Sequence, residues 1–339
     1  MFLAPLPVLF VAPHVSSVQA FLTAAAAWAI GALNTWTYYR TLELPVGVRL
    51  IAVCVPALVF GGSVLLYRAF LRRGQPVLAV LAFPVSWVGY QYLLSLSAGS
   101  YSNIAYTQMD FLPLLQLAAV TGMWGIGFVV FLVPAGIAAT TFATSGRGAV
   151  SALVVSVLSA ALAFGFVRLS NRSSDWGEPV TVGLAASDLR ENRLPEKPAD
   201  AMRALRQLAG QVDGLAQRGA RIVAFPEMSA VLSDELMPQV DAVFGAAART
   251  SQVEIILPVL HWTGRKRYNE ARVYEASGAV SAVYRKHHLV PVFEDKTTPG
   301  TELETIRRGQ SVLGLQICRD MDYPALSRRY GQLGAGPTD

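Results

Sequence analysis

Long apolar runs dominate the first half of the chain and predict membrane-spanning helices. Residues 15–39, 50–67, 76–96, 112–142 and 148–167 contain no charged side chain. A helix that crosses a bilayer needs about 20 mostly apolar residues, and these runs meet that length. Buried helices of a water-soluble protein are the alternative, but five uncharged runs in succession leave no polar face for water. We therefore expect five spans in an α-helical transmembrane bundle over residues 1–170.

A shorter apolar stretch precedes these runs. Residues 2–13 are apolar but contain Pro5, Pro7 and Pro13. No basic region precedes this stretch, so it does not resemble a cleaved signal peptide. We expect a re-entrant piece or the remnant of a helix that begins upstream.

The second half alternates short β-branched runs with amphipathic patterns, which indicates α/β architecture. An amphipathic helix is expected at residues 198–218, and a second helix at residues 240–249. The strands are expected at residues 180–185, 221–224, 253–260, 271–274, 280–284 and 311–317. Residues 171–339 are therefore predicted to form a separate α/β domain.

The charge distribution supports this division and bears on the partners of the protein. The net charge is +5, yet residues 1–170 contain seven arginines, no lysine and only Glu43 and Asp110 as acids, so the remainder is balanced. The basic excess therefore reflects arginines near membrane edges rather than a nucleic-acid-binding face, and we expect no nucleic-acid partner. Residues 68–75 include three arginines and residues 97–111 have no basic residue. This asymmetry predicts that residues 68–75 are cytoplasmic and that the chain after residue 167 lies outside.

Three short segments of the second half supply candidate chemistry. Phe225-Pro226-Glu227, Tyr284-Arg285-Lys286 and the run from Gly314 to Cys318 place a carboxylate, an amine and a thiol near strand ends. A thiol attacks well when a base removes its proton, and a cation or N–H donor stabilises the oxyanion that forms. We interpret Glu227 as the base, Lys286 as the cation and Cys318 as the nucleophile. The alternatives are structural: a buried cysteine such as Cys54, a carboxylate at a helix start and a solvated lysine.

The remaining histidines and cysteines suggest little further chemistry. His287 and His288 invite a Cys-His scheme, but neighbours on an extended segment point in opposite directions, so at most one could serve. No Cys or His cluster has zinc spacing, and Cys54 and Cys318 lie in such different contexts that a disulfide is not expected. We predict no metal and no cofactor.

The order and surroundings of the three segments resemble the nitrilase, or carbon-nitrogen hydrolase, superfamily, whose members use a Glu-Lys-Cys triad. The matching stretches are residues 222–227, 284–291 and 314–318. The resemblance implies an αββα sandwich with the triad at strand ends. It also implies supporting roles for Glu294 and Asp320, which match acidic positions of the family by order. The backbone N–H of Arg319 would join Lys286 at the oxyanion.

The first half narrows the resemblance to the apolipoprotein N-acyltransferase family. Residues 102–108, 113–118 and 121–128 are similar to three stretches of that family. The resemblance implies acyl transfer from a phospholipid through a Cys318 thioester to the N-terminal amine of a diacylglyceryl-cysteine lipoprotein. It places the chain in the bacterial inner membrane, among membrane lipid, with the catalytic domain on the periplasmic side.

Two departures from the family pattern leave other functions open. The family has Cys-Tyr-Glu where this chain has Cys318-Arg319-Asp320, and only 21 residues follow Cys318. We therefore expect a nitrilase-type domain truncated after the nucleophile, either a fragment or a degenerate copy. The alternatives are a membrane-tethered amidase or nitrilase, in which water replaces the amine, and an inactive membrane-bound remnant that acts as a scaffold.

Overall fold

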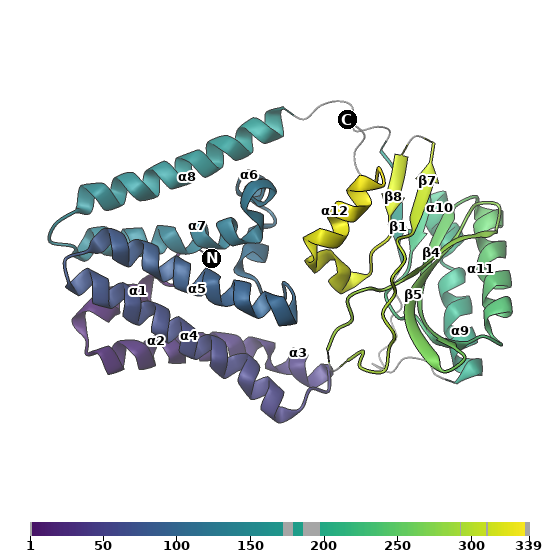
Figure 1. The fold of residues 1–339 in the computed structure, drawn as a ribbon, viewed down its shortest axis with the longest axis horizontal. Coiled ribbons are helices and arrows are strands. Elements are labelled where there is room, and N and C mark those ends of the chain that lie inside the picture. The colour runs from purple at the N-terminus through teal and green to yellow at the C-terminus, as the bar shows by residue number, and fades with distance from the viewer. Residues whose placement is uncertain (1, 172–178, 186–196, 292, 310, 336–339) are drawn as a thin grey trace. The chain divides into compact units, whose positions relative to one another are not determined.

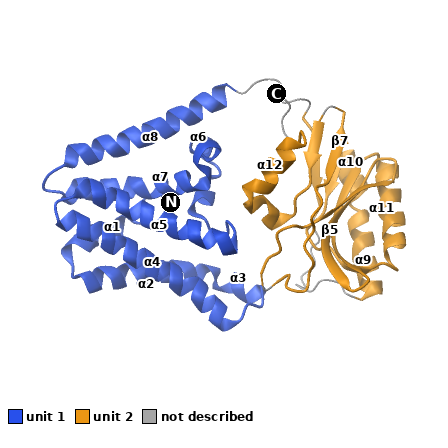
Figure 2. Ribbon diagram, viewed as in Figure 1, with its two compact units in different colours: residues 1–172 blue, residues 173–339 orange. Residues whose placement is uncertain are grey.

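The chain folds as two compact units, residues 1–172 and residues 173–339 (Figure 2). The structure is a computed structural model that describes residues 2–171, 179–185, 197–291, 293–309 and 311–335. Figure 1 shows that the first unit is helical and that the second combines strands with helices.

The first unit is a bundle of long apolar helices joined by short turns. Its α-helices are α1 (Leu6–Val11), α2 (Ser17–Ala32), α3 (Trp36–Thr41), α4 (Val46–Arg72), α5 (Pro76–Ala98), α6 (Leu112–Leu115), α7 (Ala118–Phe142) and α8 (Arg147–Ser170). The 3-10 turns are η1 (Ala12–His14), η2 (Leu33–Thr35) and η3 (Ile104–Gln108). Within the described residues, five helical segments are long and apolar enough to cross a membrane: Ser17–Thr41, α4, α5, α7 and α8. The prediction of five such segments is confirmed.

Two details of the first unit differ from the prediction. The run at residues 112–142 is not one helix, because α6 ends at Leu115 and α7 begins at Ala118. Gly122 then adopts φ +62° and ψ −165°, a conformation that residues with a Cβ rarely reach. The stretch at residues 2–13 forms α1 and η1 and buries Leu9 and Ala12 in the core of the bundle.

Arg68 also differs from expectation, since the charge pattern predicted that it lies in a loop. It lies in α4 and is 7% exposed. Its guanidinium donates hydrogen bonds to the carbonyl of Ala12 (2.9 Å), the carbonyl of Val15 (2.6 Å) and the hydroxyl of Ser17 (2.9 Å). These acceptors satisfy a buried cation and tie α4 to the turn between α1 and α2.

The second unit is built on a mixed sheet with a smaller sheet beside it. Its strands are β1 (Val182–Leu184), β2 (Ile222–Ala224), β3 (Val231–Ser233), β4 (Glu254–Thr263), β5 (Lys266–Tyr274), β6 (Val280–Arg285), β7 (Thr305–Arg308) and β8 (Ser311–Gly314). The main sheet has the order β1-β2-β4-β5-β6, and β3 also pairs with β4. Strands β1, β2 and β4 are parallel, whereas β4, β5 and β6 are antiparallel. Strands β7 and β8 form an antiparallel pair.

Helices and strands cover the two faces of the main sheet in layers (Figure 1). On one face, α9 (Pro198–Ala209), α10 (Val212–Gln217) and α11 (Met237–Ser251) bury Leu205 and Phe244 against Ile255 and Leu257 of β4. On the other face, Val273 of β5 and Tyr284 of β6 share a core with β7, with the segment that follows β8, and with α12 (Pro324–Gln332). The layers run helix, sheet, sheet, helix. The predicted fold class, a helical transmembrane-type bundle followed by an α/β nitrilase-type sandwich, is confirmed.

The element boundaries in the second unit need three corrections. The helix expected at residues 198–218 breaks at Gly210 into α9 and α10. The strand expected to run to Ile317 ends at Gly314, and Cys318 instead opens the 3-10 turn η4 (Cys318–Asp322). Strands β3 and β7 were not anticipated, because strands of three or four residues are too short to show an alternating pattern. Helix α12 was not anticipated either. Residues 336–339 of the expected tail lie outside the described part.

Candidate active site

Glu227 and Lys286 meet just beyond the ends of β2 and β6. Glu227 follows β2 by three residues, and Lys286 directly follows β6. The Lys286 Nζ donates a hydrogen bond to Glu227 Oε1 at 2.8 Å. The lysine side chain is 1% exposed and that of the glutamate is 28% exposed. A buried ammonium therefore contacts a carboxylate that remains partly open to solvent.

Glu294 is a second carboxylate at the same ammonium. The Lys286 Nζ donates to Glu294 Oε2 at 2.8 Å, and the backbone N–H of Val290 donates to the same oxygen at 2.7 Å. Burial alone would lower the pKa of Lys286, but its hydrogen bonds to Glu227 and Glu294 and their negative charges outweigh this effect and raise the pKa above its usual value. Lys286 is therefore a cation at neutral pH.

The Cys318 thiol lies within electrostatic reach of both Glu227 and Lys286. Partial burial raises the pKa of the thiol, and the charge of Glu227 and its hydrogen bond to the thiol raise it further. The charge of Lys286 and a hydrogen bond from the Arg319 backbone act in the opposite direction, but the net shift is upward. The thiol is thus protonated at neutral pH and needs a base. The structure brings the three predicted residues together, while their catalytic roles stay a prediction.

Cys318 is held in an unusual backbone conformation. It has φ +47°, and Met228, which follows Glu227, has φ +57°. Non-glycine residues in this left-handed region are uncommon and cost about 1–3 kcal/mol each, so the surrounding structure must enforce them. The residue itself remains exposed, which leaves the sulfur open to a substrate.

Asp320 anchors the turn that carries Cys318. It is completely buried and accepts hydrogen bonds from the Ile317 N–H (3.2 Å), the His288 N–H (2.8 Å) and the Tyr284 hydroxyl (2.6 Å). Its neighbour Arg319 donates from Nη1 to the Leu289 carbonyl at 2.8 Å and from Nη2 to the Tyr323 hydroxyl at 3.0 Å. Both side chains therefore connect η4 to the segment after Lys286.

The two histidines have partners outside the triad. The ring of His288 stacks on Tyr323 at 3.7 Å between centroids, and His287 stacks on Tyr284 at 5.5 Å. His288 Nδ1 also lies 3.1 Å from Asp320 Oδ1. Among the residues for which the structure gives positions, no group of three or more His, Cys, Asp or Glu side chains could hold a metal ion.

Sequence reasoning missed Asn269, a buried residue of β5. Its Nδ2 donates to Glu227 Oε1 and to Glu294 Oε1, each at 2.7 Å. The expected strand began at residue 271, so Asn269 fell outside it. The sequence signal was weak: Asn269 and Glu270 are two polar residues that precede the alternating stretch from Ala271. The position becomes noticeable once β5 is known to start at Lys266.

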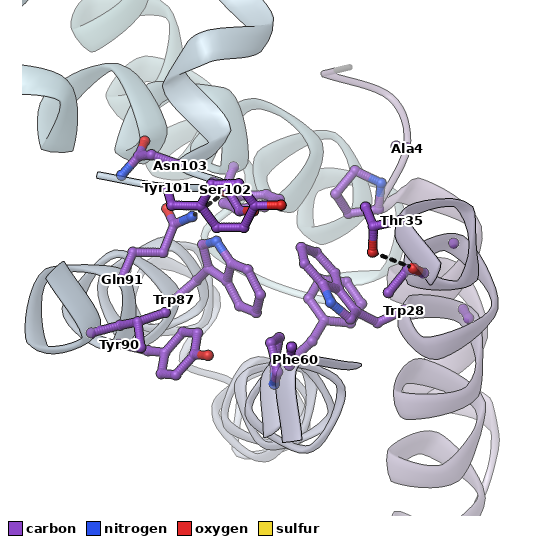
Figure 3. Close-up of a pocket in the computed structure, with 18 of the residues that line it drawn as sticks. Ala4, Trp28, Thr35, Phe60, Trp87, Tyr90, Gln91, Tyr101, Ser102 and Asn103 are labelled. Carbon is purple, nitrogen blue, oxygen red and sulfur yellow. Dashed lines mark hydrogen bonds between the residues drawn. The ribbon is translucent and has the colours of Figure 1, made fainter. Parts of the chain in front are cut away.

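The first unit contains a separate cavity of about 410 Å³. Figure 3 shows the rings of Trp28, Phe60 and Trp87 around it, contributed by α2, α4 and α5. The indoles of Trp28 and Trp87 lie 4.2 Å apart between centroids. Ser102 and Asn103 also line the cavity. They lie directly before η3, the 3-10 turn that precedes α6. Most of the lining is therefore apolar, with polar groups such as Thr35 and Gln91 as well as Ser102 and Asn103.

Two family models match separate parts of the chain. The model described as Apolipoprotein N-acyltransferase N-terminal domain matches residues 1–136. The model described as Carbon-nitrogen hydrolase matches residues 184–336. These matches correspond to the helical unit and to the α/β unit.

Two curated relatives agree with these matches. Apolipoprotein N-acyltransferase from Geobacter metallireducens is 25% identical over 355 residues, which cover 93% of this chain and 66% of the relative. Nitrilase homolog 2 from Dictyostelium discoideum is 24% identical over 145 residues, which cover 37% of this chain and 44% of the relative. The chain thus spans just under two thirds of the first relative and less than half of the second.

Solved structures similar to the chain include carbon-nitrogen hydrolases. The enzyme from Helicobacter pylori G27 has 22% identity and a TM-score of 0.38, covering 46% of this chain and 57% of that chain. A butyramide complex of a mutant amidase from Nesterenkonia sp. AN1 has 20% identity and a TM-score of 0.39, covering 45% of this chain and 61% of that chain. Together, the two family models and the Geobacter relative support the assignment of this chain to the apolipoprotein N-acyltransferase family.

Proposed function

We propose that this protein is a membrane-bound N-acyltransferase that moves an acyl chain from a phospholipid to the N-terminal amine of a diacylglyceryl-cysteine lipoprotein. One observation carries the proposal: the Lys286 ammonium lies 2.8 Å from the Glu227 carboxylate, and both act on the Cys318 thiol. A base, a cation and a nucleophile in mutual reach are the requirements of covalent acyl transfer. Similarity to the apolipoprotein N-acyltransferase family supports the choice of substrates.

In the first half-reaction, the acyl group moves from the phospholipid to Cys318. Glu227 accepts the thiol proton as Sγ attacks the ester carbonyl carbon, and Lys286 with the Arg319 N–H stabilises the oxyanion. The tetrahedral intermediate collapses, the C–O bond to glycerol breaks and Glu227 returns the proton to the leaving oxygen. The products are a lysophospholipid and an acyl thioester on Cys318.

In the second half-reaction, the acceptor amine attacks the thioester. Glu227 takes a proton from the attacking nitrogen, the C–S bond breaks and the proton passes to the Cys318 sulfur. The amide leaves and the enzyme returns to its starting form. Because both half-reactions share one site, we expect ping-pong kinetics.

The helical unit has the features expected of a binding site for the acyl donor. A cavity of about 150 Å³ accommodates benzene, with its six carbons. On that scale the 410 Å³ cavity holds roughly 16 carbons, which corresponds to one acyl chain rather than two. Its aromatic lining would favour a chain over a polar ligand.

We place the protein in the bacterial inner membrane, with the α/β unit on the periplasmic side. Five segments long and apolar enough to span a membrane support the membrane location. The orientation is inferred from the excess of basic residues in cytoplasmic loops. Arg72 and Arg73 adjoin the turn between α4 and α5, which we therefore assign to the cytoplasm. The segment between α5 and α6 has no basic residue and is assigned to the periplasm.

A labelling experiment tests the proposed function. Membranes containing the full chain are incubated with a phospholipid labelled in its acyl chains, and the Cys318 peptide is analysed by mass spectrometry. We expect a hydroxylamine-sensitive acyl thioester on Cys318. The matched control is Cys54→Ala, which changes the other cysteine and should leave the label in place. Label that persists in Cys318→Ala, or its absence from the unaltered chain, would reject the acyltransferase.

The carbon-nitrogen hydrolase match keeps the amidase alternative open. The two activities differ in the group that resolves the thioester. Addition of a diacylglyceryl-cysteine peptide should convert the labelled thioester into an N-acyl peptide. If the peptide is not acylated and the protein instead converts a small amide into its carboxylic acid and ammonia through an acyl thioester on Cys318, water is the acceptor and the carbon-nitrogen hydrolase is the correct assignment.

A further inference from the structure

We propose that Asn269 is a positioning residue that holds the Glu227 carboxylate with one of its oxygens aimed at Cys318. The inference rests on the proposed role of Glu227 as the base. Asn269 is 1% exposed and lies within β5. Its backbone carbonyl also accepts the N–H of Lys286 at 2.9 Å, so it helps to hold the segment that carries the lysine.

Asn269 and Lys286 bridge the same two carboxylates. The Nδ2 of Asn269 lies 2.7 Å from Glu227 Oε1 and from Glu294 Oε1. The Nζ of Lys286 lies 2.8 Å from Glu227 Oε1 and from Glu294 Oε2. Ionised carboxylates only accept hydrogen bonds, so the amide must present its NH₂ group to them. The four side chains therefore form a closed ring of hydrogen bonds.

The charges in this ring explain why a second donor is needed. One ammonium faces two carboxylates, and Glu294 is 1% exposed. A buried carboxylate without enough donors tends to take up a proton, which would disable a base. Asn269 supplies two N–H donors without adding a charge. It thereby provides a hydrogen bond to each of the two carboxylates.

The ring also selects the oxygen that is available for catalysis. The bonds from Lys286 and Asn269 to Glu227 both end on Oε1. The lone pairs of Oε2 are thus left for the thiol proton of Cys318. Without Asn269, only the lysine would restrain the carboxylate, and its rotation would not be fixed.

Packing alone does not account for an asparagine at this position. Its Oδ1 is buried and has no hydrogen-bond partner among the described residues. A buried acceptor without a partner is destabilising, and an apolar residue of similar size would avoid that cost. The donors of the amide, rather than its shape, are the property that the site uses.

The test compares Asn269→Asp and Asn269→Ala with the unaltered chain. Aspartate has the shape of asparagine but adds a third carboxylate and removes the donors. We expect the single-turnover rate of Cys318 thioester formation to fall about 10- to 100-fold in Asn269→Ala and further in Asn269→Asp. This loss is smaller than the full contribution of a general base, about 10²- to 10⁴-fold, because Glu227 itself is still present. The acidic limb of the pH–rate profile should move to higher pH, with an unchanged KM for phospholipid. Gln239→Glu, an amide-to-acid change on the exposed surface of α11, is the matched control and should change neither.

Two outcomes would overturn the inference. The first is a normal rate and pH profile in Asn269→Asp, which would show that only shape matters. The second is an equal loss in both variants with no shift of the pH profile, which would indicate a structural role. Alkylation of Cys318 by iodoacetamide provides a readout that needs no phospholipid. At neutral pH it should be slower in Asn269→Asp than in the unaltered chain, because the added carboxylate would raise the pKa of the thiol as the charge of Glu227 does; an equal rate counts against the proposal. If the unaltered chain forms no thioester, the proposed function fails while the alkylation comparison still tests Asn269.

Discussion

The reactivity of Cys318 depends on opposing effects of its two neighbours. Burial and Glu227 raise the pKa of the thiol, whereas Lys286 lowers it. The site therefore does not store a thiolate and needs proton transfer during the attack. This arrangement suits an enzyme that must use the same carboxylate twice, first on a thiol and then on an amine.

Substitution of Glu227 separates thiol acidity from catalysis. In Glu227→Gln, the negative charge that raises the pKa of Cys318 is lost while Lys286 remains, so the pKa should fall and alkylation by iodoacetamide at pH 7 should become faster. Thioester formation should nevertheless fall about 10²- to 10⁴-fold, because the base is missing. Mass spectrometry of the Cys318 peptide measures both, with the Cys54 peptide as internal reference. Slower alkylation together with slower acylation would show that Glu227 promotes thiolate formation instead.

At the scale of elements, a buried carboxylate joins three strands of the main sheet. Glu270 of β5 is completely buried, lies 2.9 Å from His261 Nδ1 of β4 and accepts a hydrogen bond from Arg285 of β6 at 3.4 Å. Arg272 approaches to 3.5 Å. Burial alone would raise the pKa of Glu270, but the hydrogen bond and charge of His261, with the charges of Arg272 and Arg285, outweigh it and hold the pKa below its usual value.

A lowered pKa makes the contribution of Glu270 dependent on pH. The stabilisation is present above the unfolded pKa of about 4.3 and is lost as the pH falls through the lower folded pKa. Glu270→Gln should therefore lower the free energy of unfolding by about 1–3 kcal/mol at pH 7, because it removes the buried negative charge that pairs with His261, Arg272 and Arg285, while Arg272 keeps its ion pair with Asp241. The difference should shrink in acid.

Denaturant unfolding of the full chain at pH 7 and at pH 3 measures this effect. Glu275→Gln, an exposed position just after β5, is the control and should change stability by less than about 0.5 kcal/mol. A loss that stays constant between the two pH values would mean that side-chain shape, not charge, stabilises the sheet here.

At the scale of the whole molecule, the two units have different physical tasks. The helical unit surrounds an apolar cavity, and the α/β unit carries the titratable cluster. The phospholipid donor that we propose has a long chain and a reactive ester, and would need both kinds of environment. The separation predicts that changes in the cavity affect donor affinity and leave the chemistry of the thiol unaltered.

Filling the cavity tests this division. Gly31 of α2 lines the cavity, and a Cβ added there would meet no atom within 4 Å. Gly31→Leu should raise the KM for phospholipid about tenfold, since displacing two methylenes costs about 0.8 kcal/mol each, and should leave Cys318 alkylation unchanged. The matched control is Gly62→Leu of α4, which has equal space but lies outside the cavity lining. Equal KM values for both variants in initial-rate assays would argue against donor binding in the cavity.

The sequence alone determined the features that depend on contiguous residues. The apolar runs located the five helical segments, because transfer of a helix into lipid is a sum over neighbouring residues. The segments ending at Glu227, Lys286 and Cys318 identified side chains that the structure then brought together. Periodicity also gave the α/β class, although it misplaced the end of the strand before Cys318.

Only the tertiary structure decided how the candidate residues are connected. Asn269 donates hydrogen bonds to Glu227 and Glu294, which are 42 and 25 positions away in the chain. Asp320 accepts a hydrogen bond from Tyr284, 36 positions away, and Glu294 accepts one from Lys286, 8 positions away. The left-handed turn at Cys318 and the cavity around Trp28 and Trp87 likewise depend on which elements lie side by side. Such contacts are set by strand order and helix packing, which local patterns do not encode.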